Sequence, residues 1–299
     1  MEKISYGGWD NCYHLTNGQI ELIVTGDVGP RIIRFGIIGQ ENMFKEYPEQ
    51  IGKTESDEWL IYVGHRLWHA PEAQPRTYFI DVEPVLVQEI ENGLIVTQKP
   101  EPTTGLQKQM KIQMSPDQPE VTLTHILINH NLWAVETAPW ALSVMAPGGT
   151  AVLSFPKRGP HPEFMLPTSA LAIWPYTNLS DSRWTLGYRY ILLHQDPQNA
   201  SPQKIGIYSP DGWAAYANFG KLFIKRIPIH YKGLYPDMGV NFEAFTNEDM
   251  LELESLGPME TILPKGQIDH QEHWTLVDKV PTPKTEQDVV DHILPYLQD

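Results

Sequence analysis

The chain has 299 residues, of which 41% are hydrophobic and 20% are charged, so its composition is that of a globular protein rather than a disordered one. The formal net charge is −15 and no basic cluster offsets it, which argues against binding to nucleic acid or to anionic lipid. The single cysteine, Cys12, excludes an intrachain disulfide and a cysteine-based zinc site. The N-terminal residues lack a secretory signal and no apolar run reaches the roughly 18 residues of a membrane helix, so we expect a cytoplasmic protein.

Proline and glycine are scattered along the whole chain, which is typical of many short strands joined by turns. Asn17-Gly18, Asn92-Gly93 and Asp211-Gly212 are hairpin signals. The runs that we predict to be strands are, in chain order, Ile20–Val24, Ile32–Ile38, Val85–Ile90, Leu94–Gln98, Leu106–Gln113, Val121–Asn129, Pro139–Met145, Thr150–Phe155, Leu171–Trp174, Tyr188–His194, Lys204–Ser209, Trp213–Asn218, Leu222–Pro228, Asn241–Phe245, Met250–Ser255, Thr261–Leu263 and His270–Val277.

One helix is expected, near the C-terminal end. Thr285 and Asp288 resemble a capping box, and apolar residues recur after them at helical spacing until Pro295 shortens the helix. We find no internal repeat and no domain linker between the strands. The prediction is therefore an all-β protein: a large antiparallel β-sandwich (supersandwich) over residues 1–280, with a short helical tail, residues 281–299, packing on it.

The densest group of chemically active side chains lies between Gly64 and Glu72, in a segment that we predict to be a loop. His65 offers a titratable imidazole, Arg66 a fork of hydrogen-bond donors, and Trp68 an aromatic face that would lie partly exposed as a platform. This combination suits a hydroxyl-rich ring, because polar groups bind its hydroxyls while the aromatic ring covers its C–H face. The alternative is an irregular loop held in place by packing of its arginine and tryptophan.

A second group lies in the predicted strand Met250–Ser255, where alternation places Glu252 and Glu254 on one face and leucines on the other. In a cleft, mutual repulsion and partial burial would raise the pKa of one carboxyl group and make it a general acid or base. On the solvent face of an edge strand, the two glutamates would only add solubility.

A third group of aromatic and polar side chains follows Trp213 and could line the same pocket. Lys225, Asp237 and Asn241 are its candidate substrate contacts. Lys225 is followed by Arg226, a pair that is more typical of a solvated face than of a ligand site.

Metal and cofactor signals are weak in this sequence. His270 and His273 beside Glu272 have only a loose metal-like spacing on a strand, and no glycine-rich phosphate loop is present. We therefore expect no metal and no cofactor.

Four stretches, in this order, carry a resemblance that extends from Tyr13 to Asp278: Gly29-Pro30-Arg31-Ile32, Gly64-His65-Arg66-Leu67-Trp68, Leu251-Glu252-Leu253-Glu254, and Leu263-Pro264-Lys265-Gly266 followed by His273-Trp274. Through them the chain resembles the galactose mutarotase-like superfamily, the carbohydrate-active β-sandwiches that include aldose 1-epimerases and hexose-6-phosphate epimerases. Within it, the chain looks closest to an uncharacterised branch that carries the His-Arg-Leu-Trp segment.

The resemblance implies an aldose or sugar-phosphate 1-epimerase with a small-molecule carbohydrate as its partner. In that family a glutamate removes the proton of the anomeric hydroxyl group, and Glu254 matches it. The family's acid is a histidine in a Thr-Asn-His element, where this chain has the stretch Pro139–Met145. His65 or His125 could supply the acid instead. We expect His65 to do so, facing Glu254 as the general base across one cleft on the concave face of the larger sheet, with Arg66, Trp68 and the other candidate contacts, Glu252 included, orienting the sugar.

Two other functions stay open at this stage. A non-catalytic sugar-binding module would keep Arg66 and Trp68 as contacts and need no facing acid and base. A lyase or hydrolase on the same scaffold is the third possibility, because a fold does not determine its chemistry. The sequence leaves the identity of the sugar and the oligomeric state undetermined.

Overall fold

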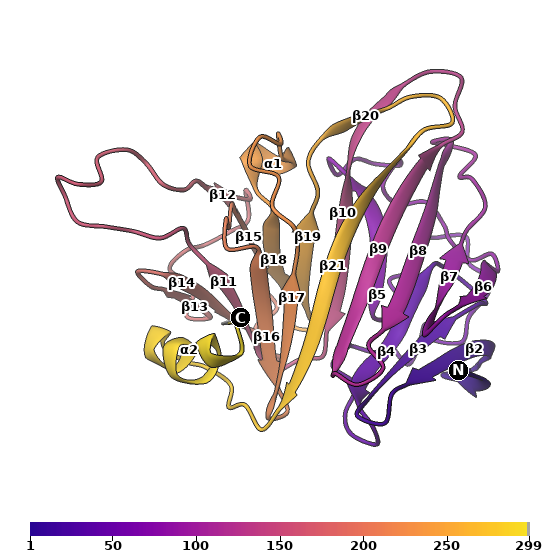
Figure 1. The fold of residues 1–299 in the computed structure, drawn as a ribbon, viewed down its shortest axis with the longest axis horizontal. Coiled ribbons are helices and arrows are strands. Elements are labelled where there is room, and N and C mark those ends of the chain that lie inside the picture. Colours follow the sequence, from indigo (N-terminus) through magenta and orange to yellow (C-terminus); the bar gives the residue numbers. More distant parts are fainter. Residues whose placement is uncertain (298–299) are drawn as a thin grey trace.

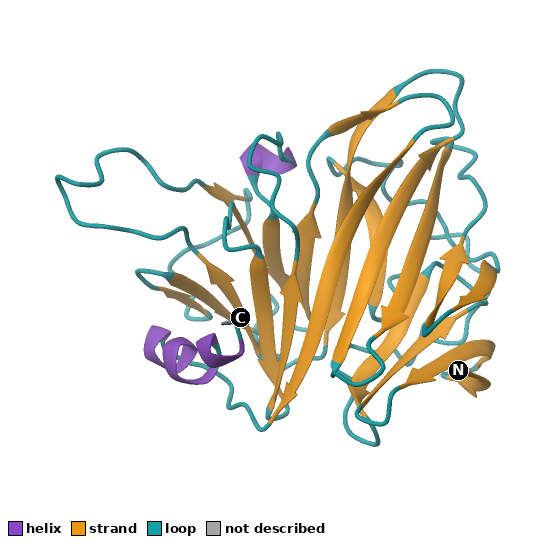
Figure 2. Cartoon of the chain, viewed as in Figure 1, coloured by secondary structure: helices purple, strands orange, loops and turns teal. Residues whose placement is uncertain are grey.

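A computed structural model describes residues 1–297, and the last two residues of the predicted tail, 298–299, lie outside them. Two large sheets face each other in a sandwich, and strands make up most of the ordered elements (Figures 1 and 2). All paired strands within both sheets are antiparallel. The all-β sandwich predicted from the sequence is therefore confirmed.

The first sheet has eleven strands. Their spatial order is β1 (Glu2–Tyr6), β2 (Trp9–Thr16), β3 (Ile20–Thr25), β4 (Arg31–Ile37), β5 (His65–Ala70), β10 (Val135–Met145), β19 (Leu251–Leu256), β18 (Phe242–Thr246), β15 (Gln203–Ile207) and β12 (Leu171–Ile173), with β20 (Glu260–Ile262) paired to one end of β10.

The second sheet has ten strands. They follow the order β13 (Trp184–Leu186), β14 (Tyr190–His194), β11 (Thr150–Ser154), β16 (Trp213–Asn218), β17 (Lys221–Arg226), β21 (Gln267–Asp278), β9 (Glu120–Asn129), β8 (Leu106–Met114), β7 (Gly93–Thr97) and β6 (Leu86–Ile90).

The main core fills the space between the sheets. Leu253 and Phe242 from the first sheet meet Phe223 and Trp274 from the second in one buried cluster. Burial alternates along β9, whose inward residues include His125, and the predicted strand Val121–Asn129 is confirmed.

The helices are short. A bend at α1 (Pro236–Gly239) precedes β18, and α2 (Glu286–His292) is followed by one turn of 3₁₀ helix (Leu294–Tyr296). Thr285 and Asp288 form the predicted capping box, and Val289 of α2 packs on the outer face of the second sheet, near β16 and β17 (Figure 1). Within residues 1–297, no helix has the length and hydrophobicity needed to cross a bilayer.

Two local predictions are corrected. Asp211-Gly212 does not make a hairpin, because β15 before it and β16 after it belong to different sheets. The segment that contains His65 is not a loop: it forms β5, in the interior of the first sheet between β4 and β10. Its sequence shows no alternation of polar and apolar residues because every residue of β5 is buried, on both faces.

Gly64 is required where the chain enters β5. It has a φ of +72°, and a Cβ atom at this position would lie 1.9 Å from the carbonyl oxygen of Ile32. Ile32 is the β4 residue that pairs with His65, so this close approach sets the register between β4 and β5.

Candidate functional site

The pairing of β5, β10 and β19 divides the candidate residues between two compartments. Arg66 and Glu254 both lie opposite Leu142 of β10, so their side chains share the face turned away from the second sheet. His65 and Leu253 both lie opposite Ser143, so their side chains point into the space between the sheets. Residues adjacent in the sequence, such as His65 and Arg66, therefore lie on opposite faces of the first sheet.

The outward face of the first sheet holds a cavity of about 330 Å³. Loops before and after β5 and the approach to β15 form its walls. Its lining consists of Trp59, Ile61, Arg66, Trp68, Glu72, Tyr78, Trp140, Leu142, Tyr176, Pro202, Lys204, Phe245, Met250 and Glu252. A hollow of about 410 Å³ near Asn17 and Asn92 has no aromatic or basic residue among its described lining, and we assign it no role.

Two ion-paired groups form the polar part of the cavity. Arg66 Nη2 donates to Glu252 Oε1 at 2.9 Å. Lys204 Nζ lies 2.7 Å from Glu243 Oε2 and 3.0 Å from Glu254 Oε2. Both cations therefore have carboxylate partners in a region with little solvent, where such pairs are much less screened than at the surface.

Aromatic rings flank both cations. The Arg66 guanidinium lies 4.4 Å from the ring centroid of Trp68, and Lys204 Nζ lies 4.8 Å from that of Trp140 and 4.7 Å from that of Trp174. Trp140 Nε1 also donates to Glu254 Oε2 at 2.7 Å. Trp68 is only 6% exposed, so the expectation of a partly exposed platform is corrected: it lines the cavity from within a packed aromatic cluster.

Burial perturbs the ionisable groups around the cavity. It raises the pKa of Glu252 above its usual range, an effect that the nearby Arg66 opposes. Burial also raises the pKa of Glu243 well above its usual range. Burial would lower the pKa of Lys204, but Glu254 and Glu243 outweigh it and raise that pKa, so the lysine stays charged.

The predicted placement of Glu252 and Glu254 on one face of a strand agrees with the structure, since both side chains turn away from the core that holds Leu253. Only Glu252 lines the cavity. Glu254 is fully buried beneath it, with one oxygen bound by Trp140 and Lys204. Its role as a base stays a prediction.

The expected pairing of His65 with Glu254 across one cleft is not formed. His65 is fully buried on the opposite face of the sheet, where Nδ1 lies 2.9 Å from Ser143 Oγ and Nε2 lies 3.1 Å from His125 Nε2. Burial lowers the pKa of His65 well below its usual range. One bound sugar could not contact both residues, because the sheet itself separates them.

Three other predicted contacts do not line the cavity either. Lys225 is fully buried on β17 between the sheets, with Nζ 2.9 Å from Glu272 Oε1. Asn241 binds the backbone of Ser209 through both ends of its amide group, at 2.7 and 2.9 Å. Asp237 lies in the α1 bend, with a φ of 50°.

Sequence reasoning missed Lys204, Tyr78 and Tyr176 in the cavity lining. Lys204 stood at the start of a predicted strand, and its partners Glu243 and Glu254 are distant in the sequence. Alternation could have placed Glu243 and Glu254 on the outward face of their strands, but not beside each other, because that requires the pairing of β18 with β19.

Comparisons with known proteins show similarity of structure but not of sequence. No protein-family model and no curated protein matches the sequence. Solved structures do match. The Slr1438 protein of Synechocystis has a TM-score of 0.56 at 12% identity, over 92% of this chain and 99% of its own. A galactose mutarotase-like protein of Lactobacillus casei has a TM-score of 0.59 at 8% identity, over 89% of this chain and 100% of its own.

A galactose mutarotase related enzyme of Lactobacillus acidophilus is similar as well, with a TM-score of 0.55 at 9% identity, over 91% of this chain and 99% of its own. These likenesses span nearly the whole sandwich. The chain therefore has the galactose mutarotase-like fold, and the resemblance seen in the sequence is confirmed at the level of the fold. Identities this low carry no residue roles from one protein to the other.

Proposed function

We propose that the protein binds a neutral sugar in the cavity on the outward face of the first sheet. The observation that carries the proposal is the lining itself. Rings from Trp59, Trp68, Trp140 and Tyr176 surround charged groups that can bind hydroxyls. This is the combination that a pyranose needs, with aromatic faces for its C–H groups and polar atoms for its hydroxyls.

Unused hydrogen-bonding capacity in the cavity supports this proposal. Among the described residues, Arg66 Nε and Nη1 have no hydrogen-bond acceptor, and both atoms are buried at the wall of the cavity. Buried polar atoms are almost always paired, so unpaired donors on a cavity-lining side chain are candidates for ligand contacts. The two unpaired nitrogens of Arg66 could donate to two neighbouring hydroxyls.

The charge balance favours a neutral sugar over a phosphorylated one. Arg66 is already paired with Glu252, and Lys204 with Glu243 and Glu254. A phosphate group would have to compete with these carboxylates for the only two cations in the described lining.

Aldose 1-epimerisation is the second candidate. The raised pKa of Glu252 favours it, because a carboxyl group titrating nearer neutrality can exchange protons with a substrate. The described lining contains no histidine, so the family's pairing of glutamate with histidine is absent from this cavity. Binding without turnover is therefore the first proposal.

The experiment is a binding screen of glucose, galactose and other aldoses against their 6-phosphates, by saturation-transfer NMR with anomeric exchange recorded in the same samples. Tyr176→Ala tests the site, because Tyr176 lines the cavity yet is 42% exposed and can be truncated without emptying the core. We expect this variant to weaken sugar binding about tenfold, or by about 1.4 kcal/mol. Tyr231→Ala, 79% exposed and outside the cavity lining, is the matched control.

Three results would contradict the proposal. Absence of saturation transfer from every aldose tested would reject sugar binding. Equal weakening by Tyr176→Ala and Tyr231→Ala would place the sugar elsewhere. Anomeric exchange that Glu252→Gln abolishes would replace binding alone with catalysis, whereas loss in Glu254→Gln only would support the base implied by the resemblance.

A further inference from the structure

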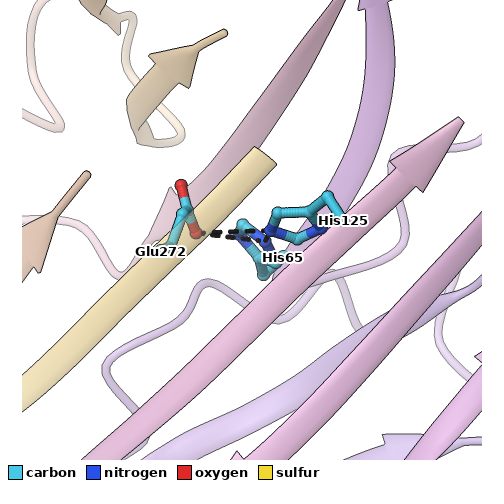
Figure 3. A group of neighbouring side chains, drawn as sticks. All are labelled: His65, His125 and Glu272. Atoms are coloured by element: carbon cyan, nitrogen blue, oxygen red, sulfur yellow. Dashed lines mark hydrogen bonds and ion pairs between the residues drawn. The ribbon is translucent and has the colours of Figure 1, made fainter. Parts of the chain in front are cut away.

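A second group of ionisable side chains lies between the sheets, and the sugar-binding proposal does not use it. It joins His65 of β5 in the first sheet to His125 of β9 and Glu272 of β21 in the second (Figure 3). The two Nε2 atoms lie 3.1 Å apart, and each lies 3.5 Å from Glu272 Oε2. All three side chains are fully buried.

These separations match the spacing of ligands around a tetrahedral cation. Zinc binds imidazole nitrogen and carboxylate oxygen at about 2.0–2.2 Å, which places adjacent ligand atoms of a tetrahedron about 3.3–3.6 Å apart. Two of the observed separations, 3.5 Å each, lie within this range, and the third, 3.1 Å between the two imidazole nitrogens, lies just below it. Two imidazoles and one carboxylate are also a ligand set that zinc uses, with one position left for water.

Groups around the cluster orient the ligand atoms. Ser143 Oγ lies 2.9 Å from His65 Nδ1; when that nitrogen donates to the hydroxyl, the lone pair of Nε2 faces His125 and Glu272. Trp274 Nε1 donates to Glu272 Oε2 at 2.9 Å and still leaves this oxygen a second lone pair. Hydrogen-bonded second partners of this kind are typical of metal ligands; His65 and Glu272 have them, whereas His125 Nδ1 has none among the described residues.

We propose that His65 Nε2, His125 Nε2 and Glu272 Oε2 hold one zinc ion that links the two sheets. Its ligands are 60 and 147 residues apart in the sequence, so the ion would connect strands that only the folded sandwich brings together. Because the site has no solvent-exposed side chain, its role is structural, and its binding energy adds to the stability of the fold. The sequence expectation of no metal was based on local spacings and on the single cysteine, which cannot show ligands that come from three separate strands.

Lys225 opposes the bound cation. Its Nζ lies 2.9 Å from the other oxygen of the same carboxylate, Glu272 Oε1, so a zinc ion and an ammonium group would share one glutamate. Like charges this close in a dry interior repel strongly. Lys225→Met keeps most of the side-chain volume and removes the charge, and it should bind zinc roughly tenfold tighter or more than the wild type.

The test uses the full chain produced without a polyhistidine tag. The metal content is measured by mass spectrometry, and the metal-free protein is then titrated with zinc and with cobalt(II), whose tetrahedral complexes absorb strongly in the visible range. We expect one ion per chain, tetrahedral cobalt bands and a higher Tm with zinc. His125→Gln should abolish all three. His273→Gln removes a histidine of β21 whose one side-chain hydrogen bond within residues 1–297 is to Thr122, and it should change none.

Wild-type protein that binds no zinc and shows no rise of Tm in excess zinc would overturn the proposal. Equal loss of metal in His125→Gln and His273→Gln would do the same, because it would indicate adventitious surface binding. If His125→Gln fails to fold, Lys225→Met decides: tighter binding supports the site, and unchanged binding rejects it. None of these outcomes depends on sugar binding, so the two proposals fail separately.

Discussion

Lys204 contacts two buried carboxylates, and Lys204→Met removes this cation. The variant keeps the aliphatic stem between Trp140 and Trp174 but leaves Glu243 and Glu254 without their shared cation. Removal of one partner from a buried ion pair typically costs about 3–5 kcal/mol, because the remaining charge is left uncompensated. We expect a loss of this size in the free energy of unfolding at neutral pH.

The loss should depend on pH. Burial already raises the pKa of Glu243 well above its usual range, and Lys204 is the main influence that lowers it. Without Lys204 the pKa of Glu243 in the folded state rises further above the unfolded value of about 4.3. Between these two pKa values the folded state binds more protons than the unfolded state, so the free energy of unfolding falls as the pH rises. One proton corresponds to about 1.4 kcal/mol per pH unit, so the cost of the substitution should be small near pH 5 and largest near pH 8.

The assay is urea unfolding followed by tryptophan fluorescence at several pH values. Lys99→Met is the matched control, because Lys99 pairs with Glu83 on the surface, where both side chains are mostly exposed, and we expect little change at any pH. Adding Glu243→Gln to Lys204→Met should restore part of the stability at high pH. A Lys204→Met cost that equals that of Lys99→Met, or that does not change with pH, would refute this reasoning.

Two further predictions concern the environment of β5. Trp68→Ala should lower the free energy of unfolding by about 3–5 kcal/mol, because Trp68 is buried among Trp59, Tyr78 and Trp140. The control, Trp133→Ala at a position 64% exposed, should change this free energy by less than about 0.5 kcal/mol. Similar urea unfolding curves for the two variants would show that Trp68 is not packed in this cluster. Gly64→Ala should destabilise more than Gly39→Ala, measured by the same urea curves. Both glycines have a φ near +71°, which costs about 1–2 kcal/mol for alanine, but only at Gly64 does the added Cβ meet backbone, and equal costs would contradict the close approach to Ile32.

The parts of the fold that the sequence predicts are those with a local signal. The run Val121–Asn129 predicted the strand β9, and the Thr285–Asp288 capping box predicted the start of α2. Alternation in β19 also separated Glu252 and Glu254 from the leucines of the core. In each case neighbouring residues carry the information, so no knowledge of strand pairing is needed.

The composition of the cavity required strand pairing instead. Glu243 and Glu254 become neighbours through the pairing of β18 with β19, and Lys204 reaches them from β15, the next strand in the sheet. No periodicity within one strand shows which strands will pair or in what register. The cation that pairs with the two glutamates was therefore missed, and Lys225, a buried lysine of the other sheet, was the lysine predicted to contact the sugar.

His65 and Arg66 show why a segment read as one motif can belong to two sites. In a strand buried on both faces, consecutive side chains point to opposite sides, so adjacent residues of β5 reach the cavity and the space between the sheets in turn. When the same segment is interpreted as a loop, both side chains can face one ligand, so His65 as the acid and Arg66 as the sugar contact are assigned to one site. Arg66 remains with the cavity and its aromatic rings, whereas His65 joins His125 and Glu272. The sheet between them allows sugar binding on one face without any contribution from the imidazole on the other.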